Sequence, residues 1–160
     1  DVVDNIIPYI EGEEDKLQFE ARKILGTTNA DNTGFIERDL IVSASCNRVP
    51  VIDGHMACVS LSFSKRPPPS VAEVKEALRS SVSDAEKLGC WSAPKPPFQI
   101  FEEQDRPQPR LDRNLQGGYT VSTGRIRADD AGIFDLKFVA LSHNSTSSAE
   151  RRLRLENSDM

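Results

Sequence analysis

The sequence has few of the residues that most often carry chemistry: of its 160 residues, three are cysteine, two are histidine and one is tryptophan. The cysteines stand at positions 46, 58 and 90, an odd number at unrelated spacings with no CxxC pair. This pattern argues against a disulfide framework or a structural zinc site, and it favours a reducing compartment. We therefore expect no bound metal and a cytoplasmic location.

Long apolar runs and an excess of positive charge are also lacking. The longest apolar run covers residues 138–141, too short to cross a bilayer, and the first residues have neither the basic region nor the apolar stretch of a signal peptide. Twenty Lys and Arg against 25 Asp and Glu give a net charge of −5, which disfavours nucleic acid and anionic membranes as partners. The glycines form neither GxGxxG nor a phosphate-binding loop. The composition predicts one soluble globular domain.

Three segments carry helix signals. Residues 13–25 place apolar side chains at helical spacing. Ser70 with Glu73, and Ser83 with Glu86, have the spacing of capping boxes, so each pair predicts the start of a further helix. The helices are short, and helices alternate with strands along the chain.

The strand signals predict a sheet. Residues 57–63 alternate apolar and small polar side chains, the pattern of a sheet covered on one face. A strand or extended run is expected over 35–45, and further strands over 98–101, 119–127 and 133–141, the last two joined by a hairpin at 129–132. Residues 105–118 form a long polar connection, which predicts a loop that is functional or pinned against a partner. We predict an α+β fold: a mixed, mainly antiparallel sheet with helices on one face.

His55 is the best candidate for acid–base chemistry. It ends a tight loop just before the clearest strand, and an imidazole is suited to proton transfer near neutral pH. Arg48, seven residues earlier, could hold a carboxylate with its planar guanidinium. The alternative is structural: Arg48 pairs with Asp53, and His55 caps the turn.

A second candidate site lies at the start of the first predicted helix, where residues 11–16 read EGEEDK. The helix dipole favours the acidic residues there, and this accounts for most of the cluster. Lys16 is less expected at this end, and beside the helix N-terminus it suits a phosphate or carboxylate ligand. None of the three cysteines has the setting of a nucleophile. The chain thus offers an acid–base candidate and anion ligands, but no nucleophile and no cofactor fold.

Several segments, in order and at matching spacing, resemble the aspartate-semialdehyde dehydrogenase family, with the closest likeness to its fungal and archaeal branch. They are spread in order over roughly residues 1–144: NIIPYIEGEEDK at 5–16, SCNRVPVIDGH at 45–55, RPQPRLDR at 106–113, GRIR at 124–127 and ALSHN at 140–144. The resemblance implies reduction of L-aspartyl-4-phosphate with NADPH in amino-acid biosynthesis, on the route to threonine and methionine among others. It also implies the C-terminal catalytic and dimerisation domain of the glyceraldehyde-3-phosphate dehydrogenase-like type, while NADP is bound mainly by an N-terminal domain that this chain lacks.

The resemblance also implies residue roles. The family's acid–base histidine falls on His55, and the arginine that binds the substrate carboxylate falls on Arg48. The substrate-contacting acidic residue and lysine fall on Glu14 and Lys16, with Glu13 as the alternative for the former. The asparagine near the nicotinamide falls on Asn144.

Two features depart from the family pattern. The nucleotide-binding half and its cysteine nucleophile are absent, and residues 145–160 do not match the Gly/Ala-rich helix that the family has after Asn144. We therefore expect a catalytic and dimerisation domain over residues 1–144 and a divergent, mobile tail over 145–160.

The leading interpretation is the substrate-binding and dimerisation half of this enzyme, inactive by itself. It would form a homodimer, or a tetramer, and bind L-aspartyl-4-phosphate or phosphate. One alternative is a non-enzymatic dimerisation module of the same fold, and another is the corresponding half of a different acyl-phosphate or aldehyde dehydrogenase. The dimer is expected through the exposed face of the sheet, because residues 57–63 and 133–141 offer more apolar positions than the short helices can cover.

Overall fold

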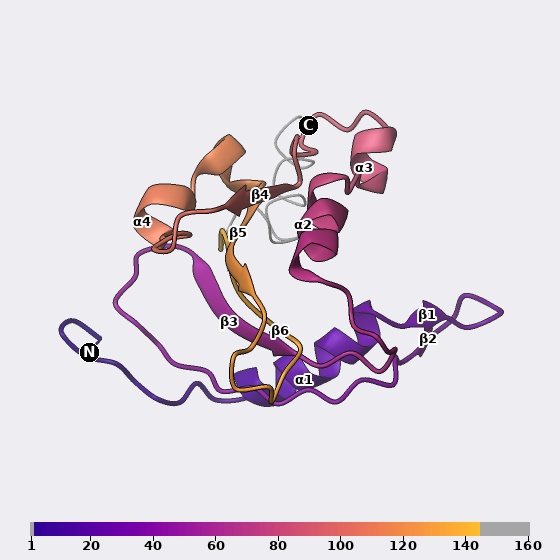
Figure 1. Cartoon of the computed structure of the whole chain (residues 1–160), viewed down its shortest axis with the longest axis horizontal. Coiled ribbons are helices and arrows are strands. Elements are labelled where there is room, and N and C mark those ends of the chain that lie inside the picture. Colours follow the sequence, from indigo (N-terminus) through magenta and orange to yellow (C-terminus); the bar gives the residue numbers. More distant parts are fainter. Residues whose placement is uncertain (1, 145–160) are drawn as a thin grey trace, which may run out of the picture. The chain divides into compact units, whose positions relative to one another are not determined.

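The computed structural model describes residues 2–144; Asp1 and residues 145–160, which include the predicted tail, lie outside the described residues. The chain forms two compact units that divide between Val51 and Ile52. The first unit carries a helix and a two-stranded sheet, and the second carries a four-stranded sheet with short helices (Figure 1). No helix within residues 2–144 is long and apolar enough to span a membrane.

The first unit contains helix α1 (Glu13–Ile24), which confirms the helix predicted from its apolar spacing. Strand β1 (Thr27–Thr28) pairs antiparallel with β2 (Phe35–Ile36). Of the strand or extended run expected over residues 35–45, only the two residues of β2 pair, and the rest has no regular structure. The physical reason is that β1 offers only two residues for pairing before the chain turns.

The second unit is a sheet in the order β3 (His55–Leu61), β6 (Leu136–Ser142), β5 (Val121–Arg127) and β4 (Phe98–Phe101). Strand β6 pairs antiparallel with both β3 and β5, whereas β4 pairs parallel with β5. The mixed, mainly antiparallel sheet is therefore confirmed. Strand β3 lies at an edge and β6 lies inside the sheet, so β6 joins the edge strand to the rest.

Both predicted capping boxes begin helices of this unit. Helix α2 (Val71–Arg79) starts with a reciprocal cap, in which Ser70 Oγ accepts the Glu73 N–H and the Glu73 carboxylate accepts the Ser70 N–H at 2.8 Å. Helix α3 (Asp84–Lys87) starts where Ser83 Oγ accepts the backbone N–H three residues on, at 3.1 Å. These caps satisfy backbone donors that would otherwise have no partner at the helix start.

Helix α2 contacts β4 and β5 on one face of the sheet (Figure 1). Ile126 and Leu136 are buried on this face, with 7% and 2% of their surfaces exposed. A cavity of about 280 Å³ remains between the helix and the strands. Its lining is almost entirely apolar and comprises Leu61, Phe63, Val74, Leu78, Phe98, Val121, Thr123, Ile126, Leu136, Phe138 and Ala140. The core of this unit is thus incompletely filled.

The hairpin predicted at residues 129–132 is confirmed. The Gly132 N–H donates to the Asp129 carbonyl at 2.9 Å, and the Asp129 carboxylate accepts the N–H groups of Ile133 and Phe134 at 3.1 Å each. Lys137 Nζ lies 3.3 Å from the same carboxylate. The Phe134 hydrogen bond, together with Lys137, lowers the pKa of Asp129. One side chain therefore fixes the turn between β5 and β6.

The long connection expected over residues 105–118 is pinned to its own sheet and is not a plain loop. It contains α4 (Pro109–Asp112) and a 3₁₀ turn, η1 (Leu115–Gly118). The Arg106 guanidinium binds the fully buried Asp112 carboxylate through Nε at 2.8 Å and through Nη2, and the Gln108 N–H donates to it at 2.6 Å. A Cβ at Gly124 would lie 2.3 Å from the Arg106 carbonyl oxygen, so only glycine lets the connection approach β5 this closely.

Burial by itself would raise the pKa of Asp112, but the hydrogen bonds from Arg106 and Gln108 and the charge of Arg106 outweigh burial, and the net pKa is lowered. A carboxyl group whose pKa is lowered in the folded state stabilises the fold above its unfolded pKa of about 3.9. That stabilisation is lost as the pH falls through the folded pKa.

We expect Asp112→Asn to lower the free energy of unfolding by about 3 kcal/mol at neutral pH, because it leaves the Arg106 charge without its partner. The difference from the unchanged chain should stay constant down to about pH 4 and shrink at lower pH. Urea titrations followed by circular dichroism between pH 3 and pH 7 measure it. Asp130→Asn, at an exposed site, is the control; equal effects of the two changes at neutral pH would contradict this account.

Candidate functional site

Glu14 ties the start of α1 to the segment that carries Arg48. Its Oε1 accepts the backbone N–H of Cys46 at 2.8 Å, a bond that spans 32 positions of the sequence. Cys46 lies two positions before Arg48, so this bond fixes the approach of that segment to the helix N-terminus. One oxygen of the Glu14 carboxylate is therefore committed to holding the backbone.

Glu13 and Lys16 face each other one helical turn apart. Lys16 Nζ lies 3.6 Å from Glu13 Oε1, and 54% and 40% of the two side chains are exposed. An exposed pair of this kind is weakly held and open to exchange with a ligand. The N-cap of α1, Gly12, makes no side-chain cap, so the first N–H groups of the helix have no capping side chain. A cation, a carboxylate and a helix N-terminus thus lie together at this end of the first unit.

Arg48 is held by its backbone, and its side chain is exposed. Its N–H donates to the Ile7 carbonyl at 2.9 Å, and the Ile7 N–H donates to the Arg48 carbonyl at 3.0 Å. This isolated antiparallel bridge fixes the main chain at Arg48. The guanidinium has no ion-pair partner among residues 2–144.

His55 and Asn144 come together in the second unit, although 89 positions separate them in the sequence. His55 is the first residue of β3 and pairs in register with Ser142 of β6. The Asn144 side chain accepts the N–H of Gly54, the residue before His55, at 2.6 Å. Asn144 therefore holds the loop that presents the exposed imidazole.

The pinned connection also borders this loop. Arg113 Nη1 donates to the Asp53 carbonyl at 3.4 Å. Gly54 has a φ of +111°, and a Cβ there would lie 3.1 Å from a Leu141 methyl and 3.5 Å from Pro109. The turn before His55 thus needs glycine for its backbone conformation and for its packing.

The three cysteines are free thiols. Burial, with the nearby charges of Glu14 and Glu13, raises the pKa of the Cys46 thiol, which keeps it protonated near neutral pH. Cys58 and Cys90 are free and exposed. Within residues 2–144, no group of three or more His, Cys, Asp or Glu could hold a metal ion. The described residues therefore offer an exposed imidazole at His55 and exposed cations at Lys16 and Arg48.

A family model described as the semialdehyde dehydrogenase dimerisation domain matches residues 1–146. The chain belongs to this family. The aspartate-semialdehyde dehydrogenase of Aspergillus fumigatus is 59% identical over 151 residues, which are 93% of this chain and 42% of that protein. The Saccharomyces cerevisiae enzyme of the same name is 54% identical over 148 residues, 91% of this chain and 40% of that protein. This semialdehyde dehydrogenase domain thus spans about two fifths of the length of these relatives.

A solved structure of the same family has the same fold as this chain. The crystal structure of aspartate semialdehyde dehydrogenase with NADP from Candida albicans superposes with a TM-score of 0.85 and 53% identity, over 93% of this chain and 42% of that one. The mixed sheet with helices is accordingly the fold of this semialdehyde dehydrogenase domain, as the sequence motifs implied.

Sequence reasoning missed two contributors to the site of the semialdehyde dehydrogenase domain. The roles of Arg113 and Pro109 beside the turn at Gly54 depend on contacts across more than fifty positions, which no local pattern shows. The RPQPRLDR segment at 106–113 was the available signal, since it was already recognisable as a family motif.

We expect Glu14→Ala to lower the free energy of unfolding by about 1.5 kcal/mol, because it leaves the Cys46 N–H without its charged acceptor. The matched control is Glu13→Ala, which removes only an exposed pair and should change stability by less than about 0.5 kcal/mol. Urea titrations of both variants provide the measurement. The assignment is wrong if the two variants have the same stability.

Proposed function

We propose that this chain is the substrate-binding and dimerising half of an aspartate-semialdehyde dehydrogenase, which reduces L-aspartyl-4-phosphate to aspartate semialdehyde with NADPH. The observation that carries the proposal is the match over residues 1–146, with proteins of that name more than half identical to the chain. The side chains described above support it, because the reaction needs an acid–base group and cations for a carboxylate and a phosphate.

His55 is the proposed acid–base group. It is exposed at the start of β3, and its loop is held from both sides by the Asn144 and Arg113 hydrogen bonds. An imidazole in this setting would accept the proton of the attacking thiol and return a proton as the tetrahedral intermediate collapses. The thiol would come from outside the described residues, because the family resemblance places the nucleophile in the nucleotide-binding half and none of the quoted motifs carries it.

Arg48 and Lys16 are the proposed anion ligands. The Arg48 guanidinium would bind the substrate carboxylate with two parallel N–H donors. Lys16 would bind the phosphate at the α1 N-terminus, where backbone N–H groups also favour negative charge. Of the two acidic candidates, the geometry favours Glu13 as the substrate contact, because Glu13 faces Lys16 while Glu14 holds the Cys46 N–H.

The described residues do not fit a nucleotide-binding site by themselves. They contain no phosphate-binding glycine loop, and Asn144 uses its side-chain oxygen to hold Gly54. The two amide N–H donors and the second lone pair of the oxygen are left for any cofactor contact by Asn144. We therefore assign NADP binding mainly to a domain outside this chain, and we expect Asn144 to act first by positioning the His55 loop.

We also propose that the chain forms a homodimer through the sheet face opposite α2. The family description supports dimerisation, and β3 at the edge of the sheet carries exposed side chains, with Met56 45% exposed. Light scattering of the purified chain tests this: a mass twice 17.7 kDa is expected, and 17.7 kDa would contradict it.

The kinetic test uses a chimera, a fungal relative whose matching region is replaced by residues 2–144 of this chain. His55→Asn should lower kcat by about 10²–10⁴-fold with little change in substrate affinity, because the general acid–base group is lost. Arg48→Lys should raise KM more than it lowers kcat, because the two parallel donors are lost. Steady-state kinetics and a melting curve for each variant provide the measurement.

Arg79→Lys, at an exposed residue paired with Glu102, is the matched control and should leave both constants unchanged. If His55 only satisfies the turn, His55→Asn should lower the melting temperature and leave kcat near normal. That result would also favour the non-enzymatic dimerisation module.

A further inference from the structure

Strand β5 has a bulge at Arg125. Gly124 pairs with Val139 and Arg127 pairs with Lys137, so two residues of β5 stand opposite one residue of β6. Arg125 has a φ of +54°, a left-handed conformation that an arginine rarely adopts. A glycine would adopt it without strain. The presence of a long charged side chain at this position therefore calls for a reason.

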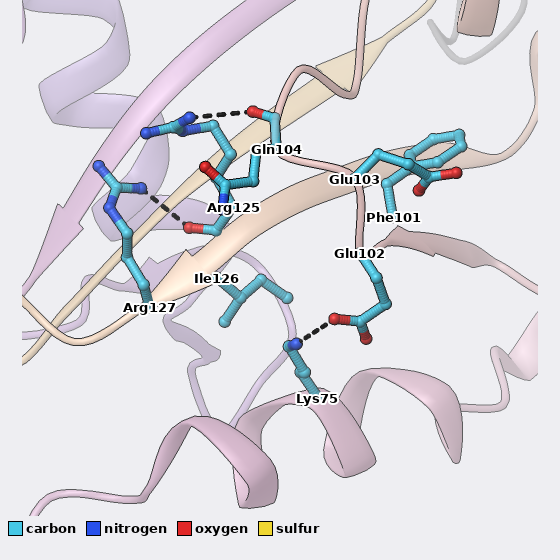
Figure 2. Close-up of a pocket in the computed structure, with 8 residues that line it drawn as sticks. All are labelled: Lys75, Phe101, Glu102, Glu103, Gln104, Arg125, Ile126 and Arg127. Carbon is cyan, nitrogen blue, oxygen red and sulfur yellow. Dashed lines mark hydrogen bonds and ion pairs between the residues drawn. The ribbon is translucent and has the colours of Figure 1, made fainter.

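The bulge brings two guanidinium groups to the same side of the strand (Figure 2). Arg125 Nη1 donates to the Gln104 carbonyl at 2.9 Å, and Arg127 Nη1 donates to the Arg125 carbonyl at 2.9 Å. Each guanidinium has five N–H donors, so most of the donors of both groups remain after these bonds. The two bonds also hold the side chains in place, one of them across the bulge itself.

Neither guanidinium has a carboxylate partner in the part of the chain that the structure describes. Glu102 is bound by Lys75 at 2.5 Å and by Arg79 at 2.8 Å. The Glu103 carboxylate points away from both guanidinium groups (Figure 2).

The neighbouring strand does not supply a counter-charge either. Lys137 stands opposite Arg127, and the carboxylate beside it, Asp129, already binds Lys137 and two backbone N–H groups. At the bulge, Arg125 and Arg127 thus lie close together without a carboxylate partner for either guanidinium among residues 2–144.

A pocket of about 220 Å³ adjoins the two guanidinium groups. Arg125 and Arg127 line it together with Lys75, Phe101, Gln104 and Ile126 (Figure 2). Two carboxylate residues, Glu102 and Glu103, also line it, and the Glu102 carboxylate is bound by Lys75 and Arg79. The position of the pocket between β5 and the end of β4 leaves room for a small ion beside the arginines. Planar guanidinium groups match the oxygens of a phosphate or a carboxylate better than those of other ligands.

We propose that Arg125 and Arg127 form a receptor for a small free oxyanion of the phosphate class, separate from Lys16 and Arg48. Three observations support this proposal: the left-handed backbone conformation of Arg125, the hydrogen bonds that hold both guanidinium groups, and the lack of a carboxylate partner for either of them. The proposal does not depend on the proposed function. Because both groups are partly or fully exposed, the affinity is in the millimolar range.

The experiment measures the melting temperature of the 160-residue chain with inorganic phosphate, at an ionic strength kept constant with sodium chloride. About 20 mM phosphate should raise the melting temperature of the unchanged chain by about 3 °C. Arg125→Gly should melt at the same or a higher temperature without phosphate, because it relieves the strain, and should lose most of the phosphate-dependent rise. Arg127→Gln should lose the rise as well.

Two controls locate the effect. Lys65→Gln removes an exposed cation elsewhere in the same unit and should keep the full rise. The double variant Lys16→Gln, Arg48→Gln removes the two proposed anion ligands of the dehydrogenase site. It should keep the part of the phosphate-dependent rise in melting temperature that depends on Arg125. This result would therefore hold even if the proposed function were wrong. The phosphorus NMR line width of phosphate, measured in the presence of the unchanged chain and of each variant, reports binding independently of stability.

The proposal is overturned if phosphate gives no rise beyond matched sodium chloride, or if Arg125→Gly and Arg127→Gln keep the full rise. It is also overturned if these variants bind no less phosphate but convert a dimer to a monomer in light scattering. In that case the oxyanion is an acidic side chain of a second copy of the chain.

Discussion

The pairing of β3 with β6 over seven residues is the interaction on which the second unit depends. It fixes His55 opposite Ser142, and so it brings the turn at Gly54 within reach of Asn144. A slip of one residue would turn every side chain of β3 to the other face and remove His55 from its neighbours. Leu136 and Leu141 of β6 are 2% and 1% exposed, and their burial fixes how β6 faces its neighbours. A slip would turn the half-buried Val59 and Leu61 of β3 to the other face, and this cost opposes it. The same packing thus specifies the register and places the candidate acid–base group.

The segment over residues 105–118 supplies the second constraint. The buried pair of Arg106 and Asp112 holds it against β5, and the close approach at Gly124 leaves no room for a side chain. From this position the segment reaches Asp53 through Arg113. The turn before His55 is therefore enclosed by two elements that lie far from it in sequence. A change at Asp112 or Gly124 would therefore move the turn, whereas a change on the exposed surface of this segment would not.

The sequence predicted those elements that are determined by residues close together in the chain. The caps at Ser70 and Ser83 and the hairpin at Asp129 depend on residues within a few positions of one another, and each was confirmed. The strand predicted from alternation over residues 57–63 is present as β3, but burial alternates only from Val59 to Leu61, because the first four residues of this edge strand are exposed. The helical turns within residues 105–118 are too short to show a period, and the bulge at Arg125 depends on the partner strand, so the sequence did not reveal them. For the candidate site, His55 and Asn144 were named from motifs, but their link through Gly54 needed the fold. The choice between Glu13 and Glu14 was open for the same reason, since it depends on where Cys46 lies.

We propose that this chain carries the acid–base and anion-binding groups of an aspartate-semialdehyde dehydrogenase, and that the thiol and the nucleotide site are supplied from outside residues 2–144. The most direct measurement is the rate of NADPH oxidation with L-aspartyl-4-phosphate, compared between the 160-residue chain alone and the chimera at equal concentration. The account predicts no turnover by the chain alone and turnover by the chimera that stops when His55 is replaced by Asn. Turnover by the chain alone, or a folded chimera without activity, would contradict it.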